Sequence, residues 1–303
     1  MEQAGEVGGR LGGHQAAGGK GAPTLYVVAT PIGNLKDVTQ RALEVLRAVD
    51  AVAAEDTRVT AKLLNHYGIT AKKLIALHEH NENRAAPRII GELAGGASIA
   101  LTSDAGTPAF SDPGARLVAA VREAGYAVVP IPGPNAAAAA LSASGFADPH
   151  FLFYGFLPAK AGERRKALEG LVHSPHLLVL YEAPHRVIET IADLAEAFGG
   201  NRRIVIAREL TKLFETVHAC ALQEAQAWLR EDANRVKGEF VLIVEGAEPD
   251  ADALATEAKH ALEVLLEELP VKQAASLAAK ITGARKNELY ALALELQNRH
   301  SDK

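Results

Sequence analysis

The chain has 303 residues, which favours two domains, and 48% of its residues are apolar, enough for sizeable hydrophobic cores. Its formal net charge of −5 argues against binding nucleic acid through bulk positive charge, so any such contact requires a local basic patch. The single cysteine, Cys220, excludes a disulfide framework and a cysteine-rich zinc site, and it fits a reducing compartment.

Residues 1–23 are rich in glycine and alanine and contain no apolar core. They do not resemble a secretory signal, which needs an apolar segment, so we predict a flexible tail. No apolar run further along is long enough to span a bilayer. These features predict a cytoplasmic protein that does not associate with membranes.

Residues 24–148 alternate short apolar runs with segments of helical periodicity. This alternation is typical of βαβ units and predicts a first α/β domain with a mostly parallel sheet. Four glycines lie where three of its helices are expected to end: Gly68, Gly95, Gly96 and Gly125. Strands are expected at 25–30, 51–56, 73–78, 98–102 and 127–132, and helices at 39–49, 60–68, 84–96 and 115–125.

Residues 149–248 show a similar alternation, and Pro149 marks the expected boundary of a second α/β domain. From 249 to 303 the pattern is purely helical, with a helix-turn-helix-like arrangement around a glycine-containing turn. A helical hairpin that packs on the body is an equally good interpretation of this last region. The expected strands of the second domain are 151–156, 177–182, 203–209, 214–219 and 239–244, and its helices are near 163–172 and 186–198.

The segment 103–114, "SDAGTPAFSDPG", is predicted to be a stiff loop at the carboxyl end of a strand. Pro108 and Pro113 fix the backbone, while Gly106 and Gly114 permit positive φ. Two more segments rich in proline and glycine fall on the same edge of the sheet: a loop at 29–39, and 130–145, where Pro-Gly-Pro is followed by an expected helix of small residues that begins with Asn135. In α/β sheets ligands bind at this edge. Neither the G-x-G-x-x-G pattern of a dinucleotide site nor a Walker A motif is present, so the site differs from both.

Seven ordered motifs carry a family resemblance: "ATPIGNLKDVT", "EDTR", "LHEHNE", "TSDAGTPAFSDPG", "YEAPHR", "ARELTK" and "KNELY". Together they closely resemble the ribosomal small-subunit RNA methyltransferase I family of the tetrapyrrole methylase superfamily. The resemblance covers roughly residues 24–297. It implies two α/β domains of the tetrapyrrole methylase type with a cleft between them, plus a C-terminal helical hairpin, usually as a homodimer.

The resemblance also implies an activity. Members of the family use S-adenosylmethionine to methylate the ribose 2′-oxygen of a cytidine in the decoding region of 16S rRNA. The expected partner is therefore 16S rRNA or the small ribosomal subunit. The residues implied to bind the methyl donor are Pro31, Ser103, Asp104, Ala105, Gly106, Thr107, Ser111, Tyr181, Glu182, Ala183, Leu210, Thr211 and Gly238.

A base that accepts the proton of the ribose hydroxyl would assist the reaction. The sequence offers Asp104, His78 and Glu79 as candidates without deciding between them. His78 and His80 have no evident third partner for a metal, so we predict polar cleft residues and no metal site. Local basic residues are expected to contact RNA: Arg58, Lys62, Arg164, Arg165, Arg186, Arg285 and Lys286.

Two departures from the family pattern fall at the cleft edge: Ala109-Phe110 replaces a more aliphatic pair, and Asn135 stands where serine is more usual. A tetrapyrrole-precursor methylase of the same fold is an alternative function. It would carry a glycine-rich segment after the first strand, where this chain has "ATPIGNL". A ligand-sensing DNA-binding regulator is a third, but its second terminal helix should be basic, and this one is dominated by carboxylates after Lys286.

Overall fold

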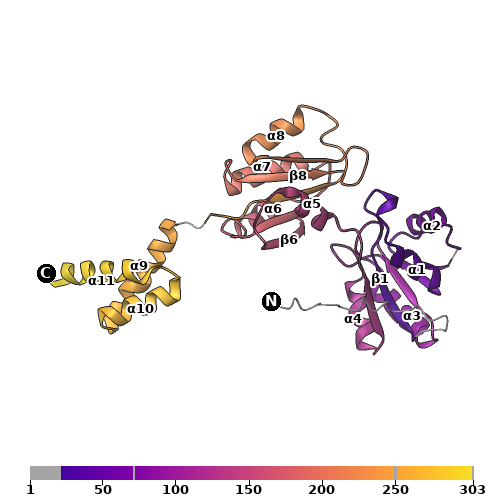
Figure 1. Ribbon diagram of the computed structural model, residues 1–303, viewed down its shortest axis with the longest axis horizontal. Helices are drawn as coiled ribbons and strands as arrows, with labels where there is room; N and C mark the ends of the chain where they lie inside the picture. Colours follow the sequence, from indigo (N-terminus) through magenta and orange to yellow (C-terminus); the bar gives the residue numbers. More distant parts are fainter. Residues whose placement is uncertain (1–21, 71, 249–250, 302–303) are drawn as a thin grey trace, which may run out of the picture.

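The computed structural model describes residues 22–70, 72–248 and 251–301, so most of the tail predicted at 1–23 lies outside the described residues. Figure 1 shows two α/β lobes side by side and a separate group of C-terminal helices. Among the described helices, none is both long enough and apolar enough to cross a membrane.

The first lobe is a five-stranded sheet in the order β3-β2-β4-β1-β5, and every pair in it is parallel. This confirms the predicted parallel sheet. The strands are β1 (Thr24–Val28), β2 (Ala51–Ala54), β3 (Lys73–Ala76), β4 (Ile99–Thr102) and β5 (Ala127–Ile131). The helices are α1 (Gln40–Ala48), α2 (Thr57–His66), α3 (Glu82–Ala94) and α4 (Ala115–Glu123), with a 3-10 turn η1 (Leu35–Asp37).

Alternation along the strands builds two hydrophobic layers around this sheet. Leu25 of β1 packs with α3 and α4 on one face, and Val28 packs with α1 and α2 on the other. Successive side chains along a strand point to opposite faces of the sheet. Because helices cover both faces here, the side chains on both faces are apolar, and each strand appears in the sequence as a short apolar run. Thr39 caps α1 because its hydroxyl accepts a hydrogen bond from the Ala42 amide.

The second lobe is a mixed sheet in the order β6-β7-β10-β8-β9. Only β6 and β7 run parallel, because β10 is antiparallel to both its neighbours and β8 forms a hairpin with β9. Its strands are β6 (Phe151–Phe156), β7 (Leu177–Glu182), β8 (Arg203–Arg208), β9 (Thr216–Ala221) and β10 (Phe240–Val244). The helices α6 (Ala161–Glu169), α7 (Val187–Phe198) and α8 (Leu222–Arg230) cover one face.

The other face of the second sheet is covered by α5 (Ala136–Ser144), a helix that the sequence prediction placed in the first domain. Its alanines, Ala137 and Ala140, are buried against Val179, Val205 and other residues of the second sheet. Small side chains let the helix approach closely. We therefore propose that the boundary between the two α/β domains lies near residues 132–135, ahead of α5, rather than at 148.

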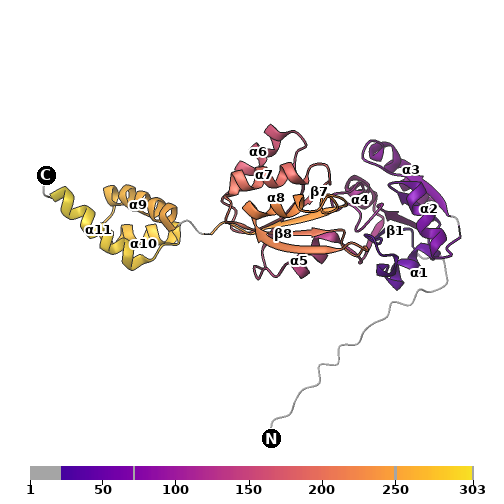
Figure 2. The same ribbon diagram turned by 90° about the horizontal axis from the view of Figure 1, so that it is seen from above.

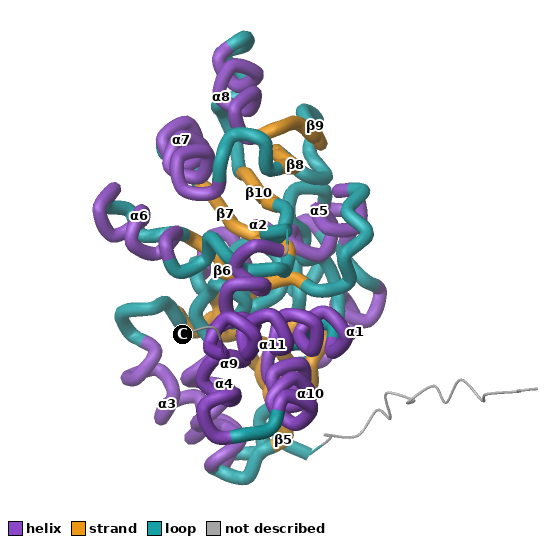
Figure 3. The backbone as a smooth tube through the Cα atoms, turned by 90° about the vertical axis from the view of Figure 1, so that its left-hand side faces the viewer, coloured by secondary structure: helices purple, strands orange, loops and turns teal. Residues whose placement is uncertain are grey.

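The C-terminal region consists of α9 (Ala251–Glu268), α10 (Val271–Thr282) and α11 (Lys286–Ser301). These helices share a core of their own, with Leu262, Ala275 and Leu289 buried in it. Figures 1 and 2 show the group standing clear of both sheets, and Figure 3 shows its helices packed side by side. The interpretation in which these helices pack on the body is therefore wrong for this structure. We propose residues 249–303 as a separate helical region.

Candidate functional site

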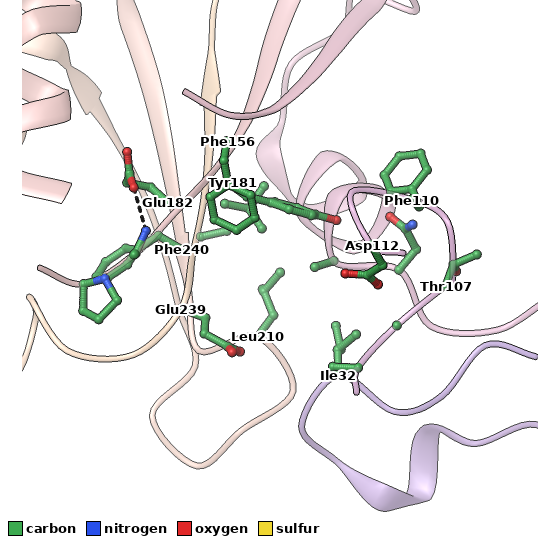
Figure 4. Close-up of a pocket in the computed structure, with 18 residues that line it drawn as sticks. Ile32, Thr107, Phe110, Asp112, Phe156, Tyr181, Glu182, Leu210, Glu239 and Phe240 are labelled. Carbon is green, nitrogen blue, oxygen red and sulfur yellow. Dashed lines mark hydrogen bonds between the residues drawn. The ribbon is translucent and has the colours of Figure 1, made fainter. Parts of the chain in front are cut away.

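A cavity of about 350 Å³ lies between the two sheets, at the carboxyl ends of the strands of the first lobe. Its size falls within the usual range for small-molecule sites. Figure 4 shows side chains from both lobes facing this space. The lining residues are Ile32, Ala105, Gly106, Thr107, Phe110, Asp112, Asn135, Ala136, Phe156, Tyr181, Glu182, Ala183, Pro184, Ala207, Leu210, Glu239, Phe240 and Val241.

The loop after β4 forms the first-lobe wall and is held by backbone contacts. Thr30 and Gly106 exchange amide–carbonyl bonds of 2.8 and 3.0 Å, which ties this loop to the end of β1. Gly106 has a φ of +80°, and Ala109 and Ser111 also have positive φ. Such conformations cost about 1–3 kcal/mol each for a residue with a side chain. The two backbone bonds hold the loop against β1, and the positive φ of Gly106 is the conformation that glycine was expected to permit there.

The second-lobe wall is built around the end of β7. The Glu182 carboxylate is buried and accepts hydrogen bonds from the Ala183 amide (2.8 Å) and the Thr190 hydroxyl (2.6 Å). Arg186 forms an ion pair with it at 3.3 Å. This network fixes Ala183 where the strand ends and the chain turns into α7. Glu182 therefore shapes the wall, and its charge is already compensated.

Aromatic rings connect the two walls. Phe110 of the first-lobe loop stacks on Phe153 of β6 with ring centroids 4.2 Å apart. Phe153 and Phe156 in turn each meet the ring of Tyr181 edge to face. Offset and edge-to-face packing of this kind adds about 0.5–1.5 kcal/mol per pair beyond the area it buries. The cavity is thus closed on this side by a continuous aromatic cluster.

The loop between β8 and β9 closes another side. The Asn34 amide donates to the Thr211 hydroxyl across the lobes at 3.0 Å. Lys212 forms ion pairs with Glu209 (2.9 Å) and Glu239 (2.8 Å). A β-carbon at Gly33 would lie 2.5 Å from Cγ of Lys212, so only glycine permits this approach. The contact holds the 31–34 segment against the second lobe.

The charged residues that line the cavity are all acidic: Asp112, Glu182 and Glu239. Glu182 and Glu239 have basic partners, whereas no ion pair to Asp112 occurs among the described residues. Burial raises the pKa of Asp112 to about 6; the Ser103 hydroxyl opposes the shift, and the charges of Glu55 and Asp104 add to it. The lining is mostly apolar with residual negative charge. It suits a cation with an apolar body better than a phosphate-bearing ligand.

Replacing Asp112 with asparagine is expected to stabilise the cofactor-free protein at pH 8 and to leave its stability unchanged near pH 3. The folded-state pKa (about 6) exceeds the usual 3.8, so stability falls as the carboxyl ionises between these values. We expect a gain of about 1 kcal/mol at pH 8, allowing for the carboxyl's partial contact with solvent. Urea unfolding across this pH range measures the gain in stability. If the difference in unfolding free energy between Asp112→Asn and wild type does not grow with pH, the raised pKa is contradicted.

The structure brings together seven of the thirteen residues implied to bind the donor: Ala105, Gly106, Thr107, Tyr181, Glu182, Ala183 and Leu210 line the cavity. The other six lie in the same loops but do not line it: Pro31, Ser103, Asp104, Ser111, Thr211 and Gly238. Several of these support the walls. The Thr211 hydroxyl accepts the hydrogen bond from the Asn34 amide. Gly238, at φ +93°, has no side chain and so leaves room for that of Glu209.

The three candidate bases do not line the cavity. Asp104 is exposed, and its carboxylate accepts a bond from the Asp56 amide at 3.0 Å. His78 and Glu79 are exposed in the loop after β3, an edge strand of the first sheet. Within the described residues, no three His, Cys, Asp or Glu side chains are grouped as a metal would need.

The predicted RNA-contacting residues divide into exposed and enclosed ones. Arg164 is only 2% exposed, and its guanidinium bonds to Asp193 at 2.6 Å, so it cannot reach RNA. Arg186 donates to the carbonyls of Leu157 and Pro158 and pairs with Glu182. Their side chains stabilise the second lobe instead. The exposed members of the set are Arg58, Lys62, Arg165, Arg285 and Lys286.

The sequence interpretation placed Phe110 at the cleft edge but missed several other lining residues, among them Ile32, Asp112, Phe156, Glu239 and Phe240. Asp112 could have been found, because it belongs to the second Ser-Asp pair of the 103–114 loop. Phe156 and Glu239 carried no such signal. Phe156 reads as an ordinary strand residue, and Glu239 faces the cavity only because β10 lies between β7 and β8.

Comparisons with known proteins agree with this architecture. A family model described as Tetrapyrrole (Corrin/Porphyrin) Methylases matches residues 24–226, and one described as the RsmI C-terminal HTH domain matches residues 252–297. A protein of Escherichia coli O157:H7 named ribosomal RNA small subunit methyltransferase I is 53% identical over 90% of this chain and 95% of its own. The chain belongs to the ribosomal RNA small subunit methyltransferase I family.

A second relative supports this membership, and a solved structure supports the fold. A Pseudomonas aeruginosa protein of the same name is 51% identical over 92% of this chain and 99% of its own. The solved structure of the methyltransferase CobJ matches 74% of this chain and 95% of its own, with a TM-score of 0.56 and 20% identity, which shows a common fold. Methyltransferases of this family use S-adenosylmethionine.

The cavity fits that cofactor. Its apolar and aromatic walls can accept an adenosine, and its acidic lining, without a lining cation, suits a sulfonium and an ammonium group. Of the amides in the loop after β4, those of Asp104 and Gly106 are already bonded to Glu55 and Thr30, which leaves the amides of Ala105 and Thr107 for a carboxylate. Asp112, Tyr181, Ala183 and Leu210 are the residues we assign to hold it.

Proposed function

We propose that this protein methylates the ribose 2′-oxygen of a cytidine in the decoding region of 16S rRNA, using S-adenosylmethionine. The supporting observation is the acidic, apolar-walled cavity between two lobes in a chain that belongs to the rRNA methyltransferase I family. The relatives' names give rRNA of the small subunit as the substrate. The cytidine, its 2′-oxygen and the decoding region are implied by the sequence resemblance.

The chain's own contribution to such a reaction is positioning. The cofactor supplies an electrophilic methyl group when bound. The loop after β4 and the end of β7 hold it from opposite sides, and both are rigid for the reasons given above. Rate enhancement then comes from presenting the methyl group in line with the incoming ribose oxygen, without further rearrangement of the walls.

RNA binding is proposed for the exposed basic residues that remain after Arg164 and Arg186 are set aside. Arg58 and Lys62 lie one turn apart on α2, and Arg165 lies on α6. Arg285 and Lys286 are exposed where α10 turns into α11. Contacts to phosphate from such scattered sites position the RNA, while the ribose hydroxyl itself distinguishes it from DNA.

A homodimer is also proposed. β6 is an edge strand of the second sheet, and it exposes a row of large apolar side chains: Phe151, Leu152, Tyr154 and Phe156. An apolar strand edge of this kind favours pairing with another chain. Equilibrium sedimentation of the purified protein tests the proposal.

A tetrapyrrole-precursor methylase remains the second candidate because the solved neighbours include enzymes of that class, such as the uroporphyrin-III-C-methyltransferase of Thermus thermophilus (TM-score 0.53, 20% identity). That structure covers 73% of this chain. Against this candidate stand the "ATPIGNL" segment after β1 and the match of residues 252–297 to a domain defined by the rRNA enzymes.

The deciding experiment mixes the purified protein with S-adenosylmethionine labelled in its methyl group. Small ribosomal subunits that lack the modification, free 16S rRNA and a uroporphyrinogen are offered separately. We expect label in the RNA, recovered after nuclease digestion as 2′-O-methylcytidine. Label on a base, or on the tetrapyrrole alone, would overturn the proposal. Comparing the two RNA samples also identifies whether the assembled subunit is needed.

A further inference from the structure

We propose that a second pocket, beside the cofactor cavity, binds an unstacked nucleotide of the RNA next to the one that is methylated. This inference rests on the proposed function, because it takes RNA as the substrate. The second pocket lies between the loop that joins β8 to β9, residues 209–215, and the segment 232–238 that leads into β10. Its volume of about 740 Å³ is within the usual range for small-molecule sites.

The second pocket shares a wall with the cofactor cavity. Glu209 and Gly238 line the pocket. The next residues along the two segments, Leu210 and Glu239, line the cavity (Figure 4). The Glu209 amide donates to the Glu239 carbonyl at 3.0 Å, and the Glu239 amide donates to the Glu209 carboxylate at 3.0 Å, so the two segments are joined at this wall. An RNA strand that brings a ribose to the cavity can therefore place an adjacent nucleotide in the pocket.

Two large apolar side chains of the second pocket are exposed. Leu213 and Phe214 both line it, and they are 89% and 66% exposed. The backbone that carries them is held in place, because the Arg208 guanidinium donates to the Phe214 carbonyl at 2.9 Å. The Thr211 amide donates to the Glu215 carboxylate and fixes the same loop. Unpaired RNA bases stack on aromatic side chains, and the Phe214 ring offers such a stacking face.

The cations of the second pocket suit a phosphate. Arg208 is 6% exposed, and its guanidinium also donates to the carbonyls of Lys237 and Asn234, both at 2.8 Å, so it connects the two walls. The Lys237 ammonium donates to the Asn234 side chain at 3.1 Å, which leaves two of its three N–H donors. Neither cation forms an ion pair with a carboxylate in the part of the chain that the structure describes. Lys237 is therefore available to bond to a phosphate oxygen.

The three carboxylates of the second pocket are engaged by their own loops. Glu209 pairs with Lys212 at 2.9 Å. The carboxylates of Glu215 and Asp232 accept hydrogen bonds from nearby backbone amides. The charged lining of the pocket is thus mixed, unlike the acidic lining of the cofactor cavity. A nucleotide matches this combination, since its base stacks on a ring while its phosphate bonds to a cation.

The test uses the full chain loaded with S-adenosylhomocysteine and a fluorescently labelled, single-stranded hexacytidylate, whose binding is followed by anisotropy. Steady-state methylation of small ribosomal subunits gives kcat and KM separately. The variants are Phe214→Ala, Phe214→Tyr, which keeps the ring, and Lys237→Gln. The matched controls are Val217→Ala, an exposed apolar residue of β9 outside both pockets, and Lys72→Gln, which lies just ahead of β3.

We expect Phe214→Ala to weaken hexacytidylate binding by about 10- to 100-fold, because it removes one stacking face. KM for small subunits should rise by a similar factor, while kcat and the affinity for S-adenosylhomocysteine stay within about twofold of wild type. Phe214→Tyr should bind as wild type does. Lys237→Gln should reduce the slope of log affinity against log salt concentration by about 0.7, as the loss of one phosphate contact to a single strand predicts. Both controls should match wild type.

Three results would overturn the proposal. The first is a Phe214→Ala variant that binds hexacytidylate as tightly as wild type. The second is loss of S-adenosylhomocysteine binding in that variant, which would mean that the change acts through the shared wall. The third is weaker binding to small subunits with unchanged binding to hexacytidylate, which would assign Phe214 to a protein contact. If wild type transfers no methyl group to RNA, the proposed function fails, and the hexacytidylate measurement still decides whether the pocket binds RNA.

Discussion

Replacing Ala183 with tryptophan is expected to weaken S-adenosylmethionine binding by at least about 100-fold and to abolish methyl transfer. Ala183 lines a cavity of about 350 Å³, and the backbone there is fixed by the bond from its amide to the Glu182 carboxylate. The indole ring cannot move away with the chain, so it occupies volume that the cofactor needs. Overfilling a well-packed site costs about 1–3 kcal/mol or more, which sets the scale of the loss.

Isothermal titration calorimetry with S-adenosylmethionine measures this effect. Ala124→Trp is a suitable control, because Ala124 is exposed at the end of α4 and does not line the cavity. It introduces the same ring without touching the site, and its affinity should equal that of wild type. If Ala183→Trp bound the cofactor with wild-type affinity, the cavity between the lobes would not be the cofactor site.

Replacing Asp193 with alanine is expected to destabilise the protein by about 3–5 kcal/mol. Asp193 and Arg164 are 4% and 2% exposed, and their bond of 2.6 Å is the central ion pair of the second lobe. Arg165 donates to the second carboxylate oxygen at 2.9 Å. Removing Asp193 leaves the buried Arg164 guanidinium with only the mostly exposed carboxylate of Glu189, 3.7 Å away, which costs far more than the Asp193 pair itself contributes.

The pH dependence of this effect has a definite sign. Burial alone would raise the pKa of Asp193, but hydrogen bonds from Arg165 and Arg164 outweigh it and lower the pKa below 3.8. A lowered pKa means that the stabilisation is complete above pH 4 and declines as the pH falls through the folded-state value. The difference between wild type and Asp193→Ala should therefore shrink in strong acid.

Urea unfolding at pH 7 measures the loss, with Arg165→Ala as the matched control. Arg165 contacts the same carboxylate, but its side chain is 57% exposed, so its removal should cost less than about 1 kcal/mol. Equal losses for the two variants would show that burial does not decide the strength of this pair. Asp193 does not line the cavity, so cofactor affinity of the folded variant should be unchanged.

The first lobe was predictable because local signals and tertiary structure agree there. Its strands are short apolar runs covered on both faces, and its helices begin and end at residues with clear capping chemistry, such as Thr39 and Gly68. The stiffness of the 103–114 loop also followed from Pro and Gly chemistry. In the second lobe the helix α8 was missed, although Leu222, Ala225 and Leu229 have helical spacing.

The side chains that meet in the cavity were harder to predict. The motifs located the loops, but they could not distinguish Asp104, which bonds to the Asp56 amide, from Asp112, which faces the cavity. Likewise, the "ERRK" segment indicates a basic surface, whereas Arg164 turns inward to Asp193. In each case the direction of one side chain depends on contacts with distant segments, about which local sequence contains no information.

Helix α5 follows β5 of the first sheet in the chain but packs on the second sheet, and this arrangement bears on how the two lobes can move. The two lobes are joined covalently only where β5 leads into α5, so any hinge between them must lie in Pro132, Gly133 and Pro134. Two prolines stiffen that linker, and a β-carbon on Gly133 would lie 2.9 Å from the Ala29 side chain. The linker therefore restricts the rotations by which the two lobes could move apart.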